Sequence, residues 1–235
     1  MLHIDDNEVR KFYNEHMDCW SDDLFSKMTT AFIDRFVNSI VRDLSDEDVL
    51  LNAGSGGKTY YTNASIFHVD IAENTLTNCK NAYACNVIDM PFSNETFDCV
   101  VCVGTVINYC NLEDALAEIS RVSKHESILI LEYERSGTAF LNKEKRNIDK
   151  VVFNHEYFDI PHKNLLYSDE LVHRILKQNG YEVLIMEYFN TAIPWLEQYF
   201  SDNIAHKLVF LEKLMRKISV FSKYSHNSIL VCKKL

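Results

Sequence analysis

The segment from Val49 to Asp70 contains residues whose types and spacing suit the binding of a nucleoside. Three of the six glycines lie in Asn52-Ala53-Gly54-Ser55-Gly56-Gly57, directly after the apolar run Val49-Leu50-Leu51, and Asp70 ends the next apolar run. Glycines allow a backbone to approach a ligand closely, and a carboxylate at the end of the following strand can accept hydrogen bonds from both ribose hydroxyls. This pattern predicts a nucleoside site at the carboxyl ends of two neighbouring strands.

The cysteines and histidines do not predict a metal site. Cys99 and Cys102 lie three residues apart in an apolar run, and on a strand such residues point to opposite faces, so they cannot bind one ion. His155 and His162 are separated by Pro161, which breaks any helix that could place metal ligands four residues apart on one face. We expect buried thiols, and packing, surface or substrate-side roles for the two histidines.

Residues 52–59 also read N-x-x-x-x-G-K-T, one substitution away from a phosphate-binding P-loop. A P-loop continues into a helix whose N-terminus holds the phosphate. Only about six residues separate Thr59 from the next apolar run, which is too few for three helical turns. Phosphate binding is therefore disfavoured.

Short apolar runs alternate with helical patterns along the chain, and they predict the elements that position these residues. Strands are expected at Val49–Leu51, Ile66–Asp70, Ala82–Asn86, Phe97–Val103, Ser127–Glu134, Tyr181–Tyr188 and Ser228–Lys233. Helices are expected around Val9–Cys19 and at Lys27–Leu44, Asn111–Val122 and Ser168–Asn179. Strands separated by helices imply a parallel α/β sheet, and the ending without a helical crossover predicts an antiparallel last strand.

Two connections, Ser136–Tyr167 and Asn190–Asn227, are longer than such a scaffold needs, so we expect them to carry function. The second contains an amphipathic helical pattern from Ile204 to Phe221. Its polar side carries Lys207, Lys213, Arg216, Lys217 and Lys223 against Glu212. A helix packed over the sheet edge is favoured; a substrate lid, a homodimer contact or a membrane-surface contact by residues 203–223 are the alternatives.

Composition indicates one compact domain and limits its partners. The 235 residues are 47% hydrophobic, and 34 acidic against 24 basic residues give a net charge of −10, which disfavours nucleic acids. No apolar run reaches the roughly 18 residues that a membrane helix needs. The acidic N-terminus lacks a signal-peptide core, and the seven cysteines are expected to be reduced, so we predict a cytoplasmic protein.

The chain resembles the class I S-adenosylmethionine-dependent methyltransferases, in particular the type 11-like, small-molecule branch. The matching pieces are VLLNAGSGG (49–57), HVDIAENTL (68–76), NVIDMPFSNETFDCVVCVGTVINYC (86–110) and EISRVSKHESILILEYERSG (118–137). The D-x-P-F…F-D run from Asp89 to Asp98 is especially typical. The resemblance implies a Rossmann-like, mostly parallel sheet with an antiparallel last strand in a single domain, 1–235. Residues 1–44 would be a helical cap, 45–135 the cofactor-binding half, and 136–167 and 190–227 insertions over the substrate pocket.

The resemblance also implies the roles of individual residues. Asp70 would hold the ribose, Asn86 would read the adenine amino group, and Tyr13 would close over the amino-acid end of the cofactor. The implied cofactor-binding residues are Tyr13, Asn52, Ala53, Gly54, Gly56, Asp70, Ile71, Asn86, Val87, Val103 and Gly104.

Some positions depart from the family pattern. Asn52 and Asn86 stand where the family usually has acids, and Lys58 occupies the third-glycine position with Gly57 one place early. These departures motivate a catalytically idle partner protein as an alternative. An NAD-dependent oxidoreductase shares the glycine turn and the acid, but it does not explain the D-x-P-F…F-D run or the antiparallel ending.

The predicted reaction transfers a methyl group from S-adenosylmethionine, leaving S-adenosylhomocysteine, to an oxygen, nitrogen or carbon of a small-molecule acceptor. The sulfonium is already activated, so alignment and water exclusion are the main tasks, and a general base is needed only if the acceptor must lose a proton. No catalytic residue and no metal ligand is assigned. The substrate-side candidates are Tyr109, Tyr133, His155 and His162, with an aromatic lining expected from Phe153, Tyr157 and Phe158.

Overall fold

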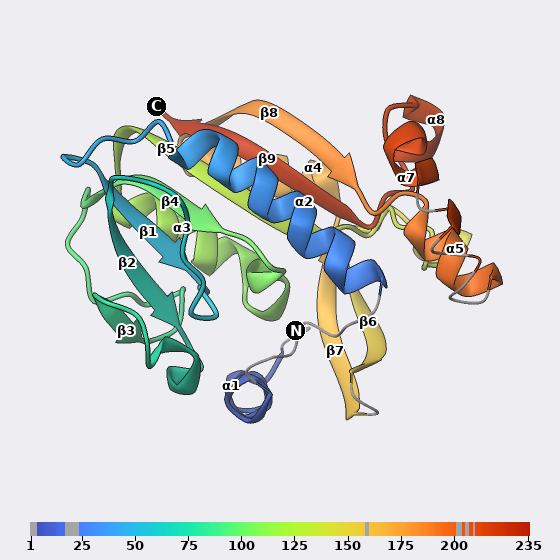
Figure 1. Cartoon of the computed structure of the whole chain (residues 1–235), viewed down its shortest axis with the longest axis horizontal. Helices are drawn as coiled ribbons and strands as arrows, with labels where there is room; N and C mark the ends of the chain where they lie inside the picture. Colours follow the sequence, from blue (N-terminus) through green and yellow to red (C-terminus); the bar gives the residue numbers. More distant parts are fainter. Residues whose placement is uncertain (1–3, 17–23, 158–159, 201–203, 205–206, 209) are drawn as a thin grey trace.

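The computed structural model describes the chain except residues 1–3, 17–23, 158–159, 201–203, 205–206 and 209 (Figure 1). The strands are β1 Val49–Ala53, β2 Ser65–Asp70, β3 Ala82–Ala84, β4 Phe97–Cys102, β5 Ser123–Glu134, β6 Lys150–Tyr157, β7 Ile160–Tyr167, β8 Tyr181–Phe189 and β9 Asn227–Lys234. The helices are α1 Asp6–Glu15, α2 Leu24–Val41, α3 Leu112–Val122, α4 Asp169–Gln178, α5 Ile193–Tyr199, α7 Phe210–Met215 and α8 Ser219–Ser222. Short 3-10 helices are η1 Glu73–Leu76, η2 Val106–Tyr109 and η3 Lys143–Lys145.

Seven strands form one sheet in the order β3-β2-β1-β4-β5-β9-β8. The pairs among β1 to β5 are parallel, whereas β9 lies antiparallel between β5 and β8. The predicted α/β fold with an antiparallel last strand is therefore confirmed. The chain runs outward from β1 to the edge at β3 and returns to β4 on the other side of β1. The carboxyl ends of β1 and β4 thus form the switch point, where open α/β sheets bind ligands.

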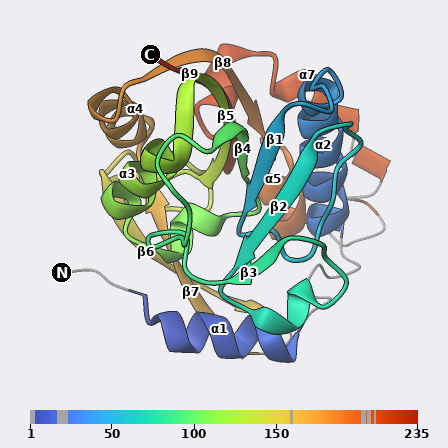
Figure 2. The same cartoon turned by 90° about the vertical axis from the view of Figure 1, so that its left-hand side faces the viewer.

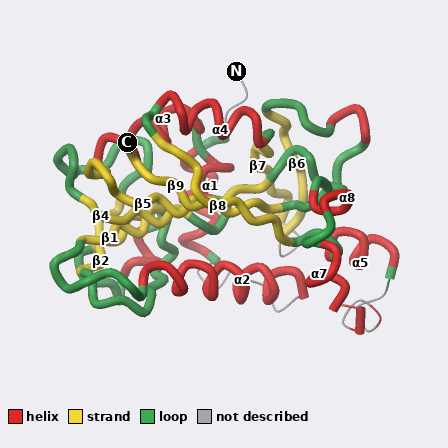
Figure 3. The backbone as a smooth tube through the Cα atoms, turned by 90° about the horizontal axis from the view of Figure 1, so that it is seen from above, coloured by secondary structure: helices red, strands yellow, loops and turns green. Residues whose placement is uncertain are grey.

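Helices cover both faces of this sheet, with α2 on one side and α3 and α4 on the other (Figure 3). Neighbouring residues of β1 alternate between the faces: Leu50 packs with the α2 side and Leu51 with the α3 side. Val37 and Val41 of α2 are fully buried on the sheet, and Phe32, Phe36 and Ile40 beside them are partly buried. The predicted cap of residues 1–44 is therefore divided, because α2 is a layer of the core and only α1 lies across the end of the sheet (Figure 2).

Most predicted element boundaries agree with the structure within a few residues. The helix predicted around Val9–Cys19 is α1, which begins after Asp5, whose carboxylate accepts a hydrogen bond from the Asn7 amide. The end of that prediction, 17–19, lies outside the described residues. Helix α3 is capped by Asn111 as predicted. Strand β5 begins four residues earlier than predicted because Ser123 pairs with Phe97 of β4.

The first long connection contains an antiparallel hairpin, β6–β7, that forms a separate two-stranded sheet. The hairpin sets His155 directly opposite His162. It lies beside α1 at the carboxyl end of the main sheet (Figure 2).

The second long connection does not form the continuous amphipathic helix that the sequence predicts. Residues 216–218 are a turn and bend between α7 and α8. Glu212, expected on the basic polar side, is instead buried and accepts the backbone amides of Thr191 and Ala192. Many of the predicted packing residues are exposed, namely Ile204, Leu214, Ile218 and Phe221. Homodimer and membrane-surface contacts through this region remain predictions.

Two predicted exclusions agree with the local structure. Cys99 and Cys102 belong to the cores on opposite faces of the sheet, so they do not form a metal pair. No helix follows Thr59, because residues 57–64 run as turns and loop directly into β2, so the P-loop geometry is absent there. In the described part of the chain, no helix combines the length and hydropathy needed to cross a membrane.

Candidate functional site

A cavity of about 170 Å³ lies at the switch point, between the carboxyl ends of β1 and β4 and helix α1. Ten of the eleven predicted cofactor-binding residues line it; Ala53 is buried in the core instead. The described lining comprises Asp6, Val9, Tyr13, Thr30, Ile33, Asn52, Gly54, Ser55, Gly56, Lys58, Tyr60, Asp70, Ile71, Thr75, Asn86, Val87, Val103, Gly104, Val106, Tyr109 and Cys110. The lining is a mixture of apolar and polar side chains, as in small-molecule sites.

The turn after β1 requires its glycines. Gly54 has φ +71°, and a Cβ there would collide with the side chain of Val106 in η2. Gly57 has φ +75°, and a Cβ there would meet the carbonyl oxygen of Thr75. Gly57 thus performs the close-approach role that the resemblance gives to the next position, occupied by Lys58.

Asp70 lies at the end of β2 and holds this turn. Its Oδ2 accepts a hydrogen bond from the Gly56 amide at 2.7 Å, and its Oδ1 accepts one from Ala72 at 2.9 Å. Burial raises the pKa of this carboxyl above its ordinary value, and the backbone N–H groups act in the opposite direction. A carboxylate can accept about four hydrogen bonds, so these two leave room for ribose hydroxyls.

The two asparagines that replace acids are each integrated into the cavity wall. Asn52 donates its side-chain amide to the carbonyl of Lys58, which closes the glycine turn. Lys58 forms an ion pair with Asp34 of α2. At the other end of the cavity, Asn86 donates to Asp6 of α1 at 2.9 Å.

Asp6 is a site residue that the sequence analysis did not identify. Its carboxylate lines the cavity beside Asn86, although the two are 80 positions apart in sequence. An acid in the first turn of a helix is already explained by its favourable interaction with the helix dipole. The sequence therefore gave no separate signal that this carboxylate enters the site.

Aromatic side chains hold helix α1 against the cavity. The ring of Tyr13 meets that of Tyr109 edge-on with 5.8 Å between centroids, and the Tyr109 hydroxyl lies 3.0 Å from Nε2 of His162. Burial, with a smaller contribution from His155, lowers the pKa of His162 to about 4, so its ring is neutral near pH 7. At the end of α1, Asn14 pairs with Asn74 of η1 through two hydrogen bonds.

The four substrate-side candidates occupy different places. Tyr109 lines the cavity at the switch point, whereas His155 and His162 face a groove of about 640 Å³ between α1 and the β6–β7 hairpin. Tyr133 is fully buried and donates its hydroxyl to Asp169 of α4, away from both spaces. Phe153 stacks on His155. The expected pocket residues Phe158 and the side chain of Tyr157 lie outside the described residues.

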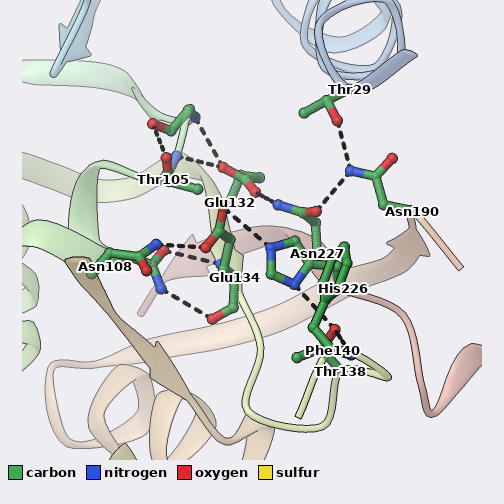
Figure 4. Close-up of polar contacts among 12 residues, drawn as sticks. Thr29, Thr105, Asn108, Glu132, Glu134, Thr138, Phe140, Asn190, His226 and Asn227 are labelled. Atoms are coloured by element: carbon green, nitrogen blue, oxygen red, sulfur yellow. Dashed lines mark hydrogen bonds and ion pairs between the residues drawn. The ribbon is translucent and has the colours of Figure 1, made fainter. Parts of the chain in front are cut away.

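A third, smaller space of about 30 Å³ shares two lining residues, Tyr13 and Gly104, with the cavity at the switch point. We call it the acidic chamber because two glutamates of β5, Glu132 and Glu134, form part of its wall. Its remaining lining consists of Phe12, Phe25, Ser26, Thr29, Thr105 and Asn227. The polar contacts around it are drawn in Figure 4.

Glu132 is fully buried at the chamber wall and bridges three neighbours (Figure 4). Its Oε2 accepts the backbone amides of Gly104 and Thr105 at 2.9 and 2.8 Å, and its Oε1 accepts the Asn227 side chain at 2.7 Å. Burial raises the pKa of Glu132 to about 7, with a smaller contribution from Glu134, against the lowering effect of these donors. Glu132 thereby fixes the turn after β4, in which Thr105 has φ +62°.

Glu134, two residues further along β5, is held by an imidazole and an amide. Its Oε1 lies 3.3 Å from Nε2 of His226, and its Oε2 accepts a hydrogen bond from Asn164 at 2.5 Å. The other ring nitrogen of His226 lies 3.1 Å from the Thr138 hydroxyl. Burial alone would raise the pKa of Glu134, but the electrostatic interaction and hydrogen bond with His226 and the bond from Asn164 leave it lowered.

The acidic chamber was not predicted from the sequence. The only local signal is the alternation Glu132-Tyr133-Glu134, which places two acids on one face of a strand that is otherwise apolar. His226 and Asn227 come from the start of β9, about ninety positions later. Only the antiparallel pairing of β9 with β5 brings them together.

Comparison with known proteins identifies the central part of the chain. Residues 51–131 match the family model described as a methyltransferase domain, which confirms the predicted resemblance. An uncharacterized protein of Methanocaldococcus jannaschii, MJ1252, is 23% identical over 236 residues, which cover 88% of this chain and 91% of that protein.

Solved structures share the fold at low sequence identity. Geranyl diphosphate C-methyltransferase from Streptomyces coelicolor A3(2), in complex with Mg²⁺, geranyl diphosphate and S-adenosyl-L-homocysteine, has a TM-score of 0.62 at 10% identity over 98% of both chains. The [4+2]-cyclase SpnF has a TM-score of 0.60 at 12% identity, over 100% of this chain and 97% of its own. These similarities show that the whole chain has the class I methyltransferase fold.

Proposed function

We propose that this chain, which carries a methyltransferase domain over residues 51–131, binds S-adenosylmethionine in the switch-point cavity and transfers its methyl group to a small-molecule acceptor. One observation carries the proposal: the carboxylate of Asp70 is anchored by Gly56 and Ala72 at the cavity wall, with acceptor capacity left for ribose hydroxyls. The complex of the Streptomyces enzyme with S-adenosyl-L-homocysteine and a small acceptor supports the same assignment.

The adenine would lie between the second and third strands and helix α1. Ile71 and Val87 supply apolar surface, and Val87 also offers its backbone amide. The adenine amino group needs a hydrogen-bond acceptor. Asn86 stands in place of the usual acid, and its partner Asp6 provides the missing carboxylate at the same place.

The amino-acid end of the cofactor would lie near Asn52 and Tyr13, beside the turn after β4. Gly54, Gly56, Val103 and Gly104 border this part of the cavity. Lys58 is the one basic side chain in the described lining, and it suits the cofactor's carboxylate. Lys58 also pairs with Asp34 of α2, which does not itself belong to the described lining.

Catalysis in this arrangement depends mainly on alignment. The sulfonium is an activated methyl donor, so the chain's residues orient the nucleophile, the methyl and the sulfur in line and keep water out. The ring contact of Tyr13 with Tyr109 places α1 between the cofactor and solvent on this side.

A second candidate function keeps the cofactor without consuming it. The match to a [4+2]-cyclase over the whole chain and the substitutions at Asn52 and Asn86 favour this alternative. Methyl-labelled S-adenosylmethionine, incubated with the protein and a protein-free metabolite extract, distinguishes the two. Methyl transfer moves the label to a small molecule, whereas a retained cofactor keeps its label.

Calorimetry with S-adenosylhomocysteine tests the cofactor assignment. We expect Asp70→Asn to weaken binding roughly 10- to 100-fold, because it removes a charge-assisted hydrogen bond worth about 1.5–3 kcal/mol. Asp98→Asn is the matched control: Asp98 also accepts a backbone N–H, from Val49, but lies at the opposite end of the sheet. Failure of the wild-type protein to bind S-adenosylhomocysteine, or tight binding of NADH instead, contradicts the proposal.

A further inference from the structure

We propose that the acidic chamber is the acceptor site, and that it selects a small, non-anionic acceptor whose N–H or O–H group gives its proton to Glu134. This inference rests on the proposed function, since it places the chamber relative to the cofactor's methyl group. No sequence pattern assigned the chamber, and it lies apart from the candidates His155, His162 and Tyr133.

The position of the chamber is the first argument. Tyr13 and Gly104 line both the cofactor cavity and the chamber, so the two spaces meet at the turn after β4. The proposed cofactor pose sets the methionine part, and therefore the methyl group, against this same turn. A molecule in the chamber is then directly beyond the methyl group, as an in-line transfer requires.

The chemistry of the wall is the second argument. Glu132 and Glu134 are buried, and an ionised carboxylate can only accept hydrogen bonds. Glu132 already accepts three, from Gly104, Thr105 and Asn227, whereas Glu134 accepts from Asn164 and faces His226, with capacity left for a ligand. A ligand that meets Glu134 must offer a donor, and repulsion by the ionised Glu134 carboxylate disfavours a phosphate or carboxylate group.

The surroundings of Glu134 are the third argument, because they hold its carboxylate ionised and in a fixed position. His226 bridges Oε1 of Glu134 and the Thr138 hydroxyl (Figure 4). Phe25 and Phe140 pack against its ring. His226 does not line the chamber, so it is a positioning residue, whereas Glu134 is the group that would touch the acceptor. A fixed, partly desolvated carboxylate within reach of an acceptor proton is the arrangement that general-base catalysis needs.

The step balances without a further reactant. A lone pair of the acceptor nitrogen or oxygen forms the new bond to the methyl carbon, and the carbon–sulfur bond breaks with its electron pair going to sulfur. The acceptor's proton passes to the Glu134 carboxylate, which returns it to water after the product leaves. The positive charge of the sulfonium and the negative charge of the carboxylate are both neutralised.

Sinefungin tests the chamber without knowledge of the acceptor, because it carries an ammonium group where S-adenosylmethionine carries its methyl-sulfonium. We expect the wild-type protein to bind sinefungin at least 10-fold more tightly than S-adenosylhomocysteine in calorimetry, since the ammonium would point at Glu134. In Glu134→Gln this preference should fall about 10-fold, while the affinity for S-adenosylhomocysteine stays within about twofold. Asp98→Asn is the control, because it removes a carboxylate at the opposite end of the sheet from the chamber and should keep the preference.

The outcomes separate this inference from the proposed function. No binding of S-adenosylhomocysteine by the wild-type protein contradicts the proposed function. Normal binding of S-adenosylhomocysteine with no preference for sinefungin, or a preference that Glu134→Gln leaves unchanged, overturns the acceptor site. The wild-type comparison requires no variant, so the inference stays testable even if Glu134→Gln fails to fold. A purely structural role of Glu134 would change stability but not the ratio of the two affinities.

Discussion

At the scale of single residues, the site combines side chains that the family pattern marks with others that it does not. Asp70 is an acid at the end of β2, as the pattern predicts, whereas Asn86 lacks the expected charge. The structure sets the carboxylate of Asp6 against Asn86, so the two together offer what one acid usually supplies. The cofactor role of each residue remains a proposal that substitutions can test.

Asp6→Asn is expected to weaken binding of S-adenosylhomocysteine about 5- to 10-fold, because a neutral amide accepts a hydrogen bond from the adenine amino group less strongly than a carboxylate does. S-inosylhomocysteine, which lacks that amino group, should lose little affinity. Calorimetry of both ligands measures the effect. Asp5→Asn is the control, since asparagine is an equally good N-cap for α1. Equal losses for both ligands would place Asp6 outside adenine recognition.

Glu132 gives stability a specific pH dependence. Its pKa is about 7 in the folded protein and about 4.3 for an unfolded glutamate. Between these values the folded state holds a proton that the unfolded state has released, so this group lowers the free energy of unfolding as pH rises. From pH 5 to 8, the unfolding free energy of Glu132→Gln relative to wild type should rise by roughly 2–3 kcal/mol.

Urea unfolding at several pH values measures the difference in unfolding free energy between Glu132→Gln and wild type. The altered contact with Gly104 lowers the unfolding free energy of the variant equally at every pH, so it does not change the slope of this difference against pH. For Glu134→Gln, the difference in unfolding free energy from wild type should change with pH in the opposite direction. The lowered pKa of Glu134 means that its contribution is present above the unfolded pKa and is lost as pH falls. A flat difference for Glu132→Gln would show that its carboxyl titrates normally in the folded protein.

At the scale of elements, β5 is joined to α4 and β8 through one buried ion pair. Arg135 makes two hydrogen bonds to Asp169, which also accepts the hydroxyls of Tyr133 and Tyr188. Arg135 further donates to the carbonyl of Ser225, just before His226 and β9. This network therefore holds the end of β5 next to the start of β9, where the acidic chamber lies. It also holds the Tyr133 hydroxyl on Asp169, away from the chamber.

Asp169→Asn should destabilise the fold by about 3–5 kcal/mol, because it leaves the Arg135 guanidinium buried without its counter-charge. Asp149→Asn is the matched control in the exposed ion pair with Arg174, where the loss should be about 1 kcal/mol or less. Chemical denaturation measures both. Similar losses for the two variants would contradict the structural role assigned to the buried pair.

At the scale of the whole molecule, α1 spans the open end of the sheet and contacts it around the cavity. Its contacts include the pairs Asp6–Asn86, Tyr13–Tyr109 and Asn14–Asn74 around the cavity, and Glu8–Lys163 and Phe12–His162 with the β6–β7 hairpin. A ligand that fills the cavity adds contacts between α1 and the sheet, so it should suppress local opening of this helix.

Hydrogen exchange measures that coupling. A ligand at a concentration 100 times its dissociation constant stabilises the state that binds it by about 2.7 kcal/mol. Amide exchange that requires an opened state without ligand then becomes roughly a hundredfold slower. We expect S-adenosylhomocysteine to slow amide exchange in α1 by up to this factor. Helix α4, also ten residues long but distant from the cavity, should show a smaller change. Equal slowing in both helices would mean that α1 has no separate opening.

The sequence by itself determined the sheet, its antiparallel last strand and the glycine turn with Asp70. These depend on periodicity, turn chemistry and strand ends, which are local along the chain. It did not determine the division between α1 and α2 or the broken helices of the second insertion, because an apolar stripe does not specify which surface covers it. Tertiary structure alone decided the pairing of Asp6 with Asn86 and the assembly of Glu134 with His226. Those contacts join residues about eighty to ninety positions apart, and only the packing of α1 and the insertion of β9 beside β5 bring them within hydrogen-bonding distance.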